Sequence, residues 1–232
     1  MKTIETPKTY GEVIAINVDV QNDFALPTGL LSVTDGEAVI APLNKLNAWA
    51  AEQEGTVIFT RDDHPLETAH FAINGGIWPI HCVQGTQGAE LHKELTVTDG
   101  AIVAYKGRSL IDDGYSGLEA EYQTADGQVA TIEQLIATRE RVAEARKTRL
   151  AIIVGGLATD FCDKATALGS LDVTHRDTTD VIVLTDAMRA VDLQPGDGDT
   201  AIKAMQEAGA IAMTTEQIIN GGIVIDTTRL ER

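Results

Sequence analysis

Hydrophobic runs alternate with amphipathic segments along most of the chain. Six short runs of aliphatic and β-branched residues predict buried strands, at residues 13–19, 56–60, 101–105, 150–156, 181–186 and 210–214. Between them, apolar residues recur at the three- and four-residue spacing of a helix face, over residues 39–53, 131–147 and 199–207. A further helix is expected to begin near Asp160, with Thr159 or Asp160 as its cap.

This alternation predicts an α/β fold with three layers. We expect a mostly parallel six-stranded sheet with helices on both faces. No repeat, low-complexity tract or linker interrupts the pattern, and 232 residues fit one large domain, so residues 1–232 are expected to form a single domain. Sheets of this kind bind ligands beyond the carboxyl ends of their strands, which is where chemistry is expected.

Charge and composition narrow the range of functions. The formal net charge of -17 argues against nucleic acid, whose phosphates require a basic surface. No stretch approaches the roughly 20 apolar residues of a membrane span, and the first residues lack a signal-peptide apolar run, so we expect a cytoplasmic protein with no membrane partner. The two cysteines, Cys82 and Cys162, are too few for a disulfide framework. Homo-oligomerisation is left open.

Three reactive side chains follow predicted strands at this edge of the sheet. Asp19 ends the first strand, Lys106 closes the third, and Cys162 stands in the first turn of the helix expected after the fourth. Free N–H groups at a helix start favour a thiolate, and partial burial raises a carboxyl pKa toward that of a useful base. Each residue also has an ordinary interpretation: a buried inert thiol, a turn cap and a solvated lysine.

Histidines gather in the segment after the second strand. Asp62 and His64 alternate on an extended stretch, and His70 and His81 follow, so three of the chain's five histidines fall between residues 64 and 81. An aspartate with two or three histidines suits zinc, iron or manganese. The alternative is that these histidines lie on the surface of a long loop. The two remaining histidines, His92 and His175, are interpreted as surface residues.

Six motifs in order resemble the nicotinamidases of the isochorismatase-like cysteine hydrolases. They extend over about residues 13–219 and read DVQNDF, RDDH, WPIHCVQGTQGAELH, YKG, YSGLE and GLATDFC. The resemblance implies the isochorismatase-like fold, hydrolysis of nicotinamide as a step of NAD salvage, and one divalent metal ion (Zn, Fe or Mn).

The resemblance also implies roles for individual residues. Asp19, Lys106 and Cys162 match the catalytic triad, and Asp62, His64 and His81 match the metal ligands; His70 matches a further ligand of some members. The backbone amides of Ala158 and Cys162 match the oxyanion hole, next to a Leu157–Ala158 bond that is cis in the family. The residues matched to substrate binding are Phe24, Trp78, Leu157 and Tyr115.

The sequence departs from the family pattern in three places. Asp163 replaces a residue that is commonly aliphatic, the RSLIDDGYSG loop is longer than the short versions, and the helix at 131–147 is extended. Two alternatives stay open: a superfamily amidase for carbamoyl or ureido substrates, whose members generally lack the metal motif, and a non-catalytic metal-binding protein. An isochorismate-type hydrolase is disfavoured, since Cys162 is not expected there.

Overall fold

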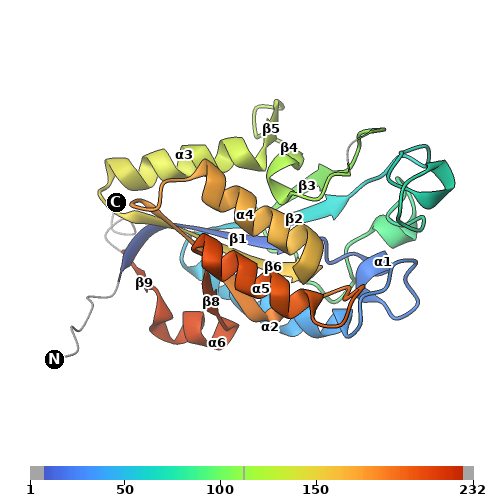
Figure 1. Ribbon diagram of the computed structural model, residues 1–232. Helices are drawn as coiled ribbons and strands as arrows, with labels where there is room; N and C mark the ends of the chain where they lie inside the picture. The colour runs from blue at the N-terminus through green and yellow to red at the C-terminus, as the bar shows by residue number, and fades with distance from the viewer. Residues whose placement is uncertain (1–7, 112, 227–232) are drawn as a thin grey trace.

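The computed structural model describes residues 8–111 and 113–226, in which strands and helices alternate as predicted (Figure 1). The strands are β1 (Thr9–Val18), β2 (Thr56–Asp62), β3 (Ile102–Lys106), β4 (Glu121–Gln123), β5 (Val129–Thr131), β6 (Arg149–Leu157), β7 (Thr179–Arg189), β8 (Ile211–Met213) and β9 (Val224–Ile225). The helices are α1 (Asn22–Ala25), α2 (Ile40–Glu52), α3 (Ile132–Ala145), α4 (Lys164–Val173), α5 (Asp197–Ala208) and α6 (Thr215–Gln217). None of the helices in the described ranges is long and apolar enough to cross a bilayer.

The strands form one sheet in the order β5-β4-β3-β2-β1-β6-β7-β8, with β9 paired to the start of β1. The six predicted strands pair in parallel, which confirms the predicted fold class. The predicted strand number was too low, because the described residues form nine. Three strands were missed: β4 and β5, which extend the β3 edge in antiparallel fashion, and β9. Each has only two or three residues, too few for a periodic signal.

Helices cover both faces of the sheet because β1 is apolar on both sides. Val13 and Ala15 pack in the core that includes Leu43 and Leu46 of α2. Ile14 and Ile16 pack in the opposite core, which the helices α3, α4 and α5 cover. Figure 1 shows these three helices together on one side of the sheet, with α2 and α6 on the other. The helix α2 begins two residues before Pro42, so this proline lies in the first turn, where its missing N–H group costs no helix hydrogen bond.

The topology creates a crevice at the carboxyl ends of the central strands. β1 lies between β2 and β6, so the chain leaves the sheet in opposite directions on the two sides of β1. Gly156 allows the close approach of β6 to β1, because a Cβ there would lie 2.1 Å from the Val18 carbonyl oxygen. The predicted site residues of β1, β2, β3 and β6 therefore reach one rim of the sheet.

A long connection between β2 and β3 extends beyond this rim (Figure 1). It carries all three candidate histidine ligands and Trp78. Its backbone is held by defined contacts: the His64 amide donates to the Cys82 carbonyl, and the Trp78 amide donates to the His70 carbonyl. Long connections of this kind are usually functional.

Candidate active site

Asp19, Lys106 and Cys162 meet at the carboxyl ends of the central strands. The Lys106 ammonium lies 2.8 Å from Asp19 Oδ2 and 3.6 Å from Cys162 Sγ, and all three side chains are buried. The structure thus brings together the three reactive residues that the sequence placed at strand ends.

Two further oxygens surround the buried ammonium. Lys106 donates to Asp62 Oδ1 and to the Gly114 carbonyl, the latter at 2.8 Å. The parallel register explains the first contact, because Asp62 and Lys106 are direct partners across β2 and β3. Burial would lower the pKa of Lys106, but Asp19 and Asp62 raise it well above its usual value. The lysine is therefore charged.

The two carboxylate oxygens of Asp19 have different partners. Its Oδ1 accepts a hydrogen bond from the Thr60 hydroxyl at 2.7 Å, while Oδ2 faces Lys106. The residue has a φ of 48°, in the left-handed region that aspartate tolerates better than most residues. Burial raises the pKa of Asp19 to about 6, although Lys106 opposes the shift. A carboxyl group with this pKa can both take and return a proton near neutral pH.

Cys162 lies in a π-helical turn, Thr159–Asp163, that leads into α4. The Leu157–Ala158 bond before it is cis. Burial raises the pKa of the Cys162 thiol well above its usual value, and Lys106 only partly opposes this. The thiol is thus protonated at rest and requires a base, so burial outweighs the thiolate-favouring helix start expected from the sequence.

The predicted side-chain cap of this helix was wrong. Among the described residues, neither Thr159 nor Asp160 accepts a capping hydrogen bond from the first backbone N–H groups of this helix. Asp160 instead accepts hydrogen bonds from the amides of Val191 and Asp192, each at 2.9 Å. This contact fixes the segment after β7 against the nucleophile's turn.

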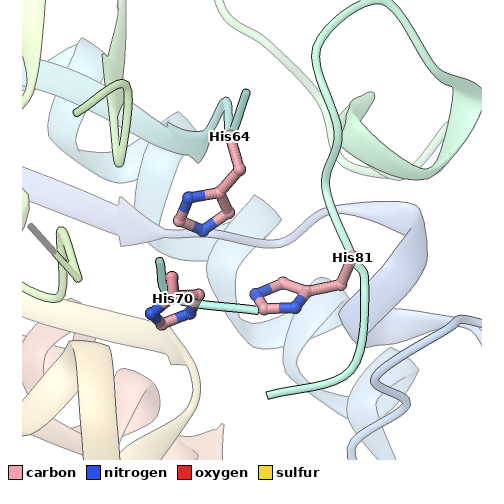
Figure 2. Close-up of side chains that lie close together, drawn as sticks. All are labelled: His64, His70 and His81. Atoms are coloured by element: carbon pink, nitrogen blue, oxygen red, sulfur yellow. The ribbon is translucent and has the colours of Figure 1, made fainter. Parts of the chain in front are cut away.

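His64, His70 and His81 form a cluster next to these residues. One ring nitrogen of each lies within 4.8 Å of the others, and all three residues are buried. Figure 2 shows the three imidazoles converging from separate parts of the long connection. The rings of His64 and His70 are stacked with centroids 4.7 Å apart. This is a compact set of donors for one ion.

Hydrogen bonds define which nitrogen of each histidine faces the cluster. The Nδ1 atoms of His64 and His81 contact the carbonyl oxygens of Gly107 at 2.9 Å and Pro79 at 2.7 Å. A carbonyl only accepts, so each Nδ1 carries a proton and each Nε2 is left as a donor of electrons. His64 Nε2 is buried, has no hydrogen-bond partner in the part of the chain that the structure describes, and lies 3.5 Å from Asp62 Oδ2.

The state of Asp62 suits a cation. Burial would raise the pKa of Asp62, but Lys106 and His64 together hold it below its usual range. Burial also lowers the pKa of His81 to about 4. Asp62 is therefore an anionic carboxylate and His81 a neutral imidazole, the protonation states that metal ligation requires.

A cavity opens between the reactive residues and the histidine cluster. It holds about 370 Å³ of space not occupied by protein atoms, including solvent at its open mouth. Its lining comes from six parts of the chain: α1 and the segment after it, β2, the long connection, the 107–115 loop, the nucleophile's turn and the segment after β7. The lining residues are Phe24, Leu31, Asp62, His70, Trp78, His81, Asp113, Tyr115, Ala158, Phe161, Cys162 and Val191.

Aromatic side chains form the apolar walls of this cavity. The Trp78 indole donates to the Tyr115 hydroxyl at 2.8 Å, and its ring meets Phe161 edge-on at 4.8 Å. Phe24 lies against the His81 ring at 5.3 Å. Phe24, Trp78 and Tyr115 thus stand at the cavity as the sequence predicted, which also places Tyr115 despite the longer loop before it; residue 112 of that loop lies outside the described residues.

Two sequence-based assignments differ from the structure. The Leu157 side chain is fully buried in the core and does not line the cavity. His92 was interpreted as a surface residue, but its side chain is 1% exposed and lies 3.3 Å from a Glu37 carboxylate oxygen. His175 is 77% exposed, as expected.

Other residues at the site were missed. Thr60 lies two residues before Asp62 on β2, so the two side chains are on the same face of the strand. This spacing could have identified Thr60 as a residue of the site. Phe161 directly precedes the nucleophile in the TDFC motif and was an available signal as well. Leu31, Asp113 and Val191 come from irregular segments, where no periodicity indicates direction.

Comparisons with known proteins identify the family of this chain. The Isochorismatase domain model matches residues 13–109. The chain is 33% identical over 212 residues to the nicotinamidase of Escherichia coli (strain K12), covering 85% of this chain and 92% of that protein. The chain belongs to the nicotinamidase family. Two solved structures align closely as well.

The structural relatives of this nicotinamidase-family chain carry informative ligands. A Pyrococcus horikoshii pyrazinamidase in complex with zinc is 30% identical, with a TM-score of 0.69 over 88% of this chain and 99% of that one. An L. infantum protein in complex with nicotinate is 25% identical, with a TM-score of 0.69 over 95% of this chain and 99% of that one.

Asp163, which directly follows the proposed nucleophile, is a buried acidic residue. Its side chain is fully buried, and neither carboxyl oxygen has a hydrogen-bond partner among the described residues. Burial raises the pKa of Asp163 well above its usual value, and nearby Asp19 and Asp160 add to the shift. Asp163 is therefore kept neutral, so it adds no negative charge beside Cys162.

Asp163 is expected to destabilise the folded protein increasingly as pH rises. Because the pKa of Asp163 is higher in the folded than in the unfolded protein, its ionisation does not affect the free energy of unfolding below the unfolded-state pKa. Above that pH, the free energy of unfolding decreases until the pH reaches the folded-state pKa. The variant Asp163→Asn cannot ionise at this position. Its free energy of unfolding relative to the wild type should therefore increase by more than about 1 kcal/mol as the pH is raised from 5 to 7. Denaturant unfolding of both proteins across this range checks it; a difference that stays constant or shrinks with rising pH contradicts it.

Proposed function

We propose that this chain is a metal-containing cysteine amidohydrolase that converts nicotinamide to nicotinate and ammonia. The observation that carries the proposal is that Asp19, Lys106 and Cys162 meet beside a three-histidine cluster at one aromatic cavity. The nicotinamidase of E. coli and the nicotinate-bound L. infantum structure support the choice of substrate. The product acid would re-enter NAD salvage.

The proposed reaction forms a thioester on Cys162. Asp19 takes the thiol proton, and the sulfur attacks the amide carbon. The backbone N–H groups of Ala158 and Cys162 are proposed to hold the oxyanion, where removing one donor often costs about 3 kcal/mol. Asp19 then gives its proton to the leaving nitrogen, so that ammonia departs as the C–N bond breaks.

The second half of the reaction reverses these proton transfers. Asp19, again a carboxylate, takes a proton from the attacking water, whose oxygen bonds to the thioester carbon. The C–S bond breaks as Asp19 returns this proton to Cys162, and the released nicotinic acid loses its remaining proton to solvent to give nicotinate. Lys106 keeps Asp19 in place in both halves, because its ammonium is fixed by Asp19, Asp62 and the Gly114 carbonyl.

The residues of the histidine cluster fit a divalent metal ion. The unpartnered, buried Nε2 of His64 and the nearby Asp62 carboxylate are the observation that supports this fit. We propose Asp62, His64, His81 and His70 as its ligands, with Zn, Fe or Mn as the ion. When bound, such an ion supplies a Lewis-acid site for a pyridine nitrogen. This chain's own residues complete acyl transfer without it.

The cavity walls suit a flat aromatic amide. Phe24 and Trp78 are proposed to contact the two faces of the pyridine ring, and Tyr115 supports Trp78 through its hydroxyl. Leu157 is proposed to act through its backbone only, since its side chain lies in the core. The ring nitrogen would then point toward the histidines.

Three broader expectations complete the proposal. Residues 1–232 form a single domain, the partner is a small-molecule substrate, and the protein is cytoplasmic. Cys82 and Cys162 are both unpaired and buried, which accords with a reducing compartment. Homo-oligomerisation is compatible with this function but not required by it.

Cys162→Ala is expected to abolish nicotinamide hydrolysis while leaving the fold intact. The nucleophile is lost, but only a small side chain at the rim is removed. Cys82→Ala is the matched control, because Cys82 is also a buried free thiol yet lies outside the proposed machinery. Ammonia release by both metal-loaded variants checks the prediction. Substantial turnover by a well-folded Cys162→Ala protein would rule out the nucleophile.

Asp19 is expected to set the acid limit of activity. Because its pKa is raised to about 6, the carboxylate is lost as pH falls through that value, and kcat/KM should fall with it. Asp19→Asn should lose 10²–10⁴-fold in kcat/KM, the usual range for a general base. A pH profile with metal content measured at each point tests this. A flat profile down to pH 5, or a loss under tenfold in Asp19→Asn, opposes the assignment.

The metal is expected to select substrates with a ring nitrogen. Benzamide has the same carboxamide but no ring nitrogen, so it should be a far poorer substrate than nicotinamide. His64→Ala, which removes a proposed ligand, should weaken this preference together with binding, because correct orientation is worth several kcal/mol. The comparison of kcat/KM for both amides on both proteins decides it. If the preference survives loss of the metal, the ion only holds the 62–81 segment.

A further inference from the structure

The three histidines of the cluster are oriented by different kinds of acceptor. His64 and His81 direct Nδ1 to neutral backbone carbonyls. His70 directs Nδ1 to a carboxylate: Asp113 Oδ1 lies 2.7 Å away. A hydrogen bond to a charged acceptor is shorter and stronger than one to a carbonyl. The acceptor of His70 is thus the strongest of the three.

The His70–Asp113 pair joins a buried ring to an exposed side chain. The His70 side chain is 3% exposed, whereas that of Asp113 is 55% exposed and stands at the cavity lining. The buried His70 ring is therefore oriented by a carboxylate that is not itself packed in the core. Its orientation depends on where the 107–115 loop places Asp113.

The 107–115 loop contacts the histidine cluster, the buried lysine and the aromatic wall of the cavity. Its Gly107 carbonyl accepts from His64, its Gly114 carbonyl accepts from Lys106, and its Tyr115 hydroxyl accepts from Trp78. Gly107 is required for this approach, since its φ is 68° and a Cβ would lie 2.5 Å from His64 Cε1.

The loop is also tied to the segment that carries His70. The Ala69 amide donates to the Leu110 carbonyl at 2.8 Å, and the Thr68 hydroxyl donates to the Ser109 carbonyl at 3.2 Å. These two bonds hold residues 109 and 110 of the loop against residues 68 and 69, which directly precede His70. The loop that carries Asp113 is thus attached to the segment that carries His70.

We propose that Asp113 is a positioning residue that holds His70 as a metal ligand, so that the 107–115 loop sets how tightly the ion is bound. The inference rests on the metal-binding part of the proposed function. A carboxylate behind a ligating histidine fixes its tautomer and raises its basicity, and losing such a partner typically costs 10–100-fold in metal affinity. Asp113 itself need not contact the ion.

The test is the Zn²⁺ affinity of the full-length protein, measured by competition with a chromophoric chelator. Asp113→Ala should bind Zn²⁺ 10–100-fold more weakly than the wild type. Asp113→Asn should lose less, because its amide oxygen still accepts from Nδ1 but carries no charge. Glu67→Gln is the matched control, since it removes an exposed carboxylate three residues from His70; its affinity should match the wild type within about threefold.

A double-variant cycle separates positioning from general electrostatics. If Asp113 acts through His70, Asp113→Ala should cause no further loss of affinity in a His70→Ala background. The absorption spectrum of the Co²⁺-loaded protein should change in the same way in Asp113→Ala and His70→Ala, as both lose one nitrogen ligand. Thermal unfolding of the metal-free variants confirms that each is folded.

Three results would overturn the inference. They are a Zn²⁺ affinity of Asp113→Ala within about threefold of the wild type, an equal loss in the His70→Ala background, or an equal loss in Glu67→Gln. Failure of the proposed substrate is distinguishable, because it shows as absent nicotinamide hydrolysis by wild-type protein that binds Zn²⁺ normally. Such a protein would still support the assignment of Asp113.

Discussion

The site depends on the buried ion pairs that the Lys106 ammonium forms with two carboxylates. Asp19 belongs to the acyl-transfer half of the site and Asp62 to the metal half, and a single positive charge compensates both. Removing one partner of a buried ion pair leaves an uncompensated charge and typically costs 3–5 kcal/mol. The two halves are therefore electrostatically linked. The parallel register that aligns Asp62 with Lys106 makes this link a consequence of the sheet.

The same burial sets the protonation states for the proposed chemistry. Burial keeps the Cys162 thiol protonated and raises the pKa of Asp19 toward neutrality, so the resting site holds a neutral nucleophile beside a ready base. Asp163 is neutral for the same reason. A charged Asp163 would oppose the negative charge that develops on the sulfur. Its burial thus reconciles an acidic residue at this position with a cysteine nucleophile.

The central strands and the residues at their ends were predictable from the sequence, because long apolar runs fix both. Asp19 and Lys106 follow such runs directly, and parallel strands bring them to one rim. The strands β4, β5 and β9 were not predictable, since two or three residues carry no period. The burial of His92 and the direction of Asp160 depend on contacts with distant segments. Asp113 was missed for the same reason: its partner lies 43 residues away on another loop.

The most direct test of the account is to look for the acyl intermediate during nicotinamide hydrolysis. Metal-loaded protein is mixed with nicotinamide, quenched in acid within the first turnovers and digested, and the peptide carrying Cys162 is examined by mass spectrometry while ammonia is assayed in parallel. The account predicts ammonia release together with a nicotinoyl group on Cys162, and neither in Cys162→Ala. Ammonia release that continues in Cys162→Ala, or a nicotinoyl group on a residue other than Cys162, would contradict it.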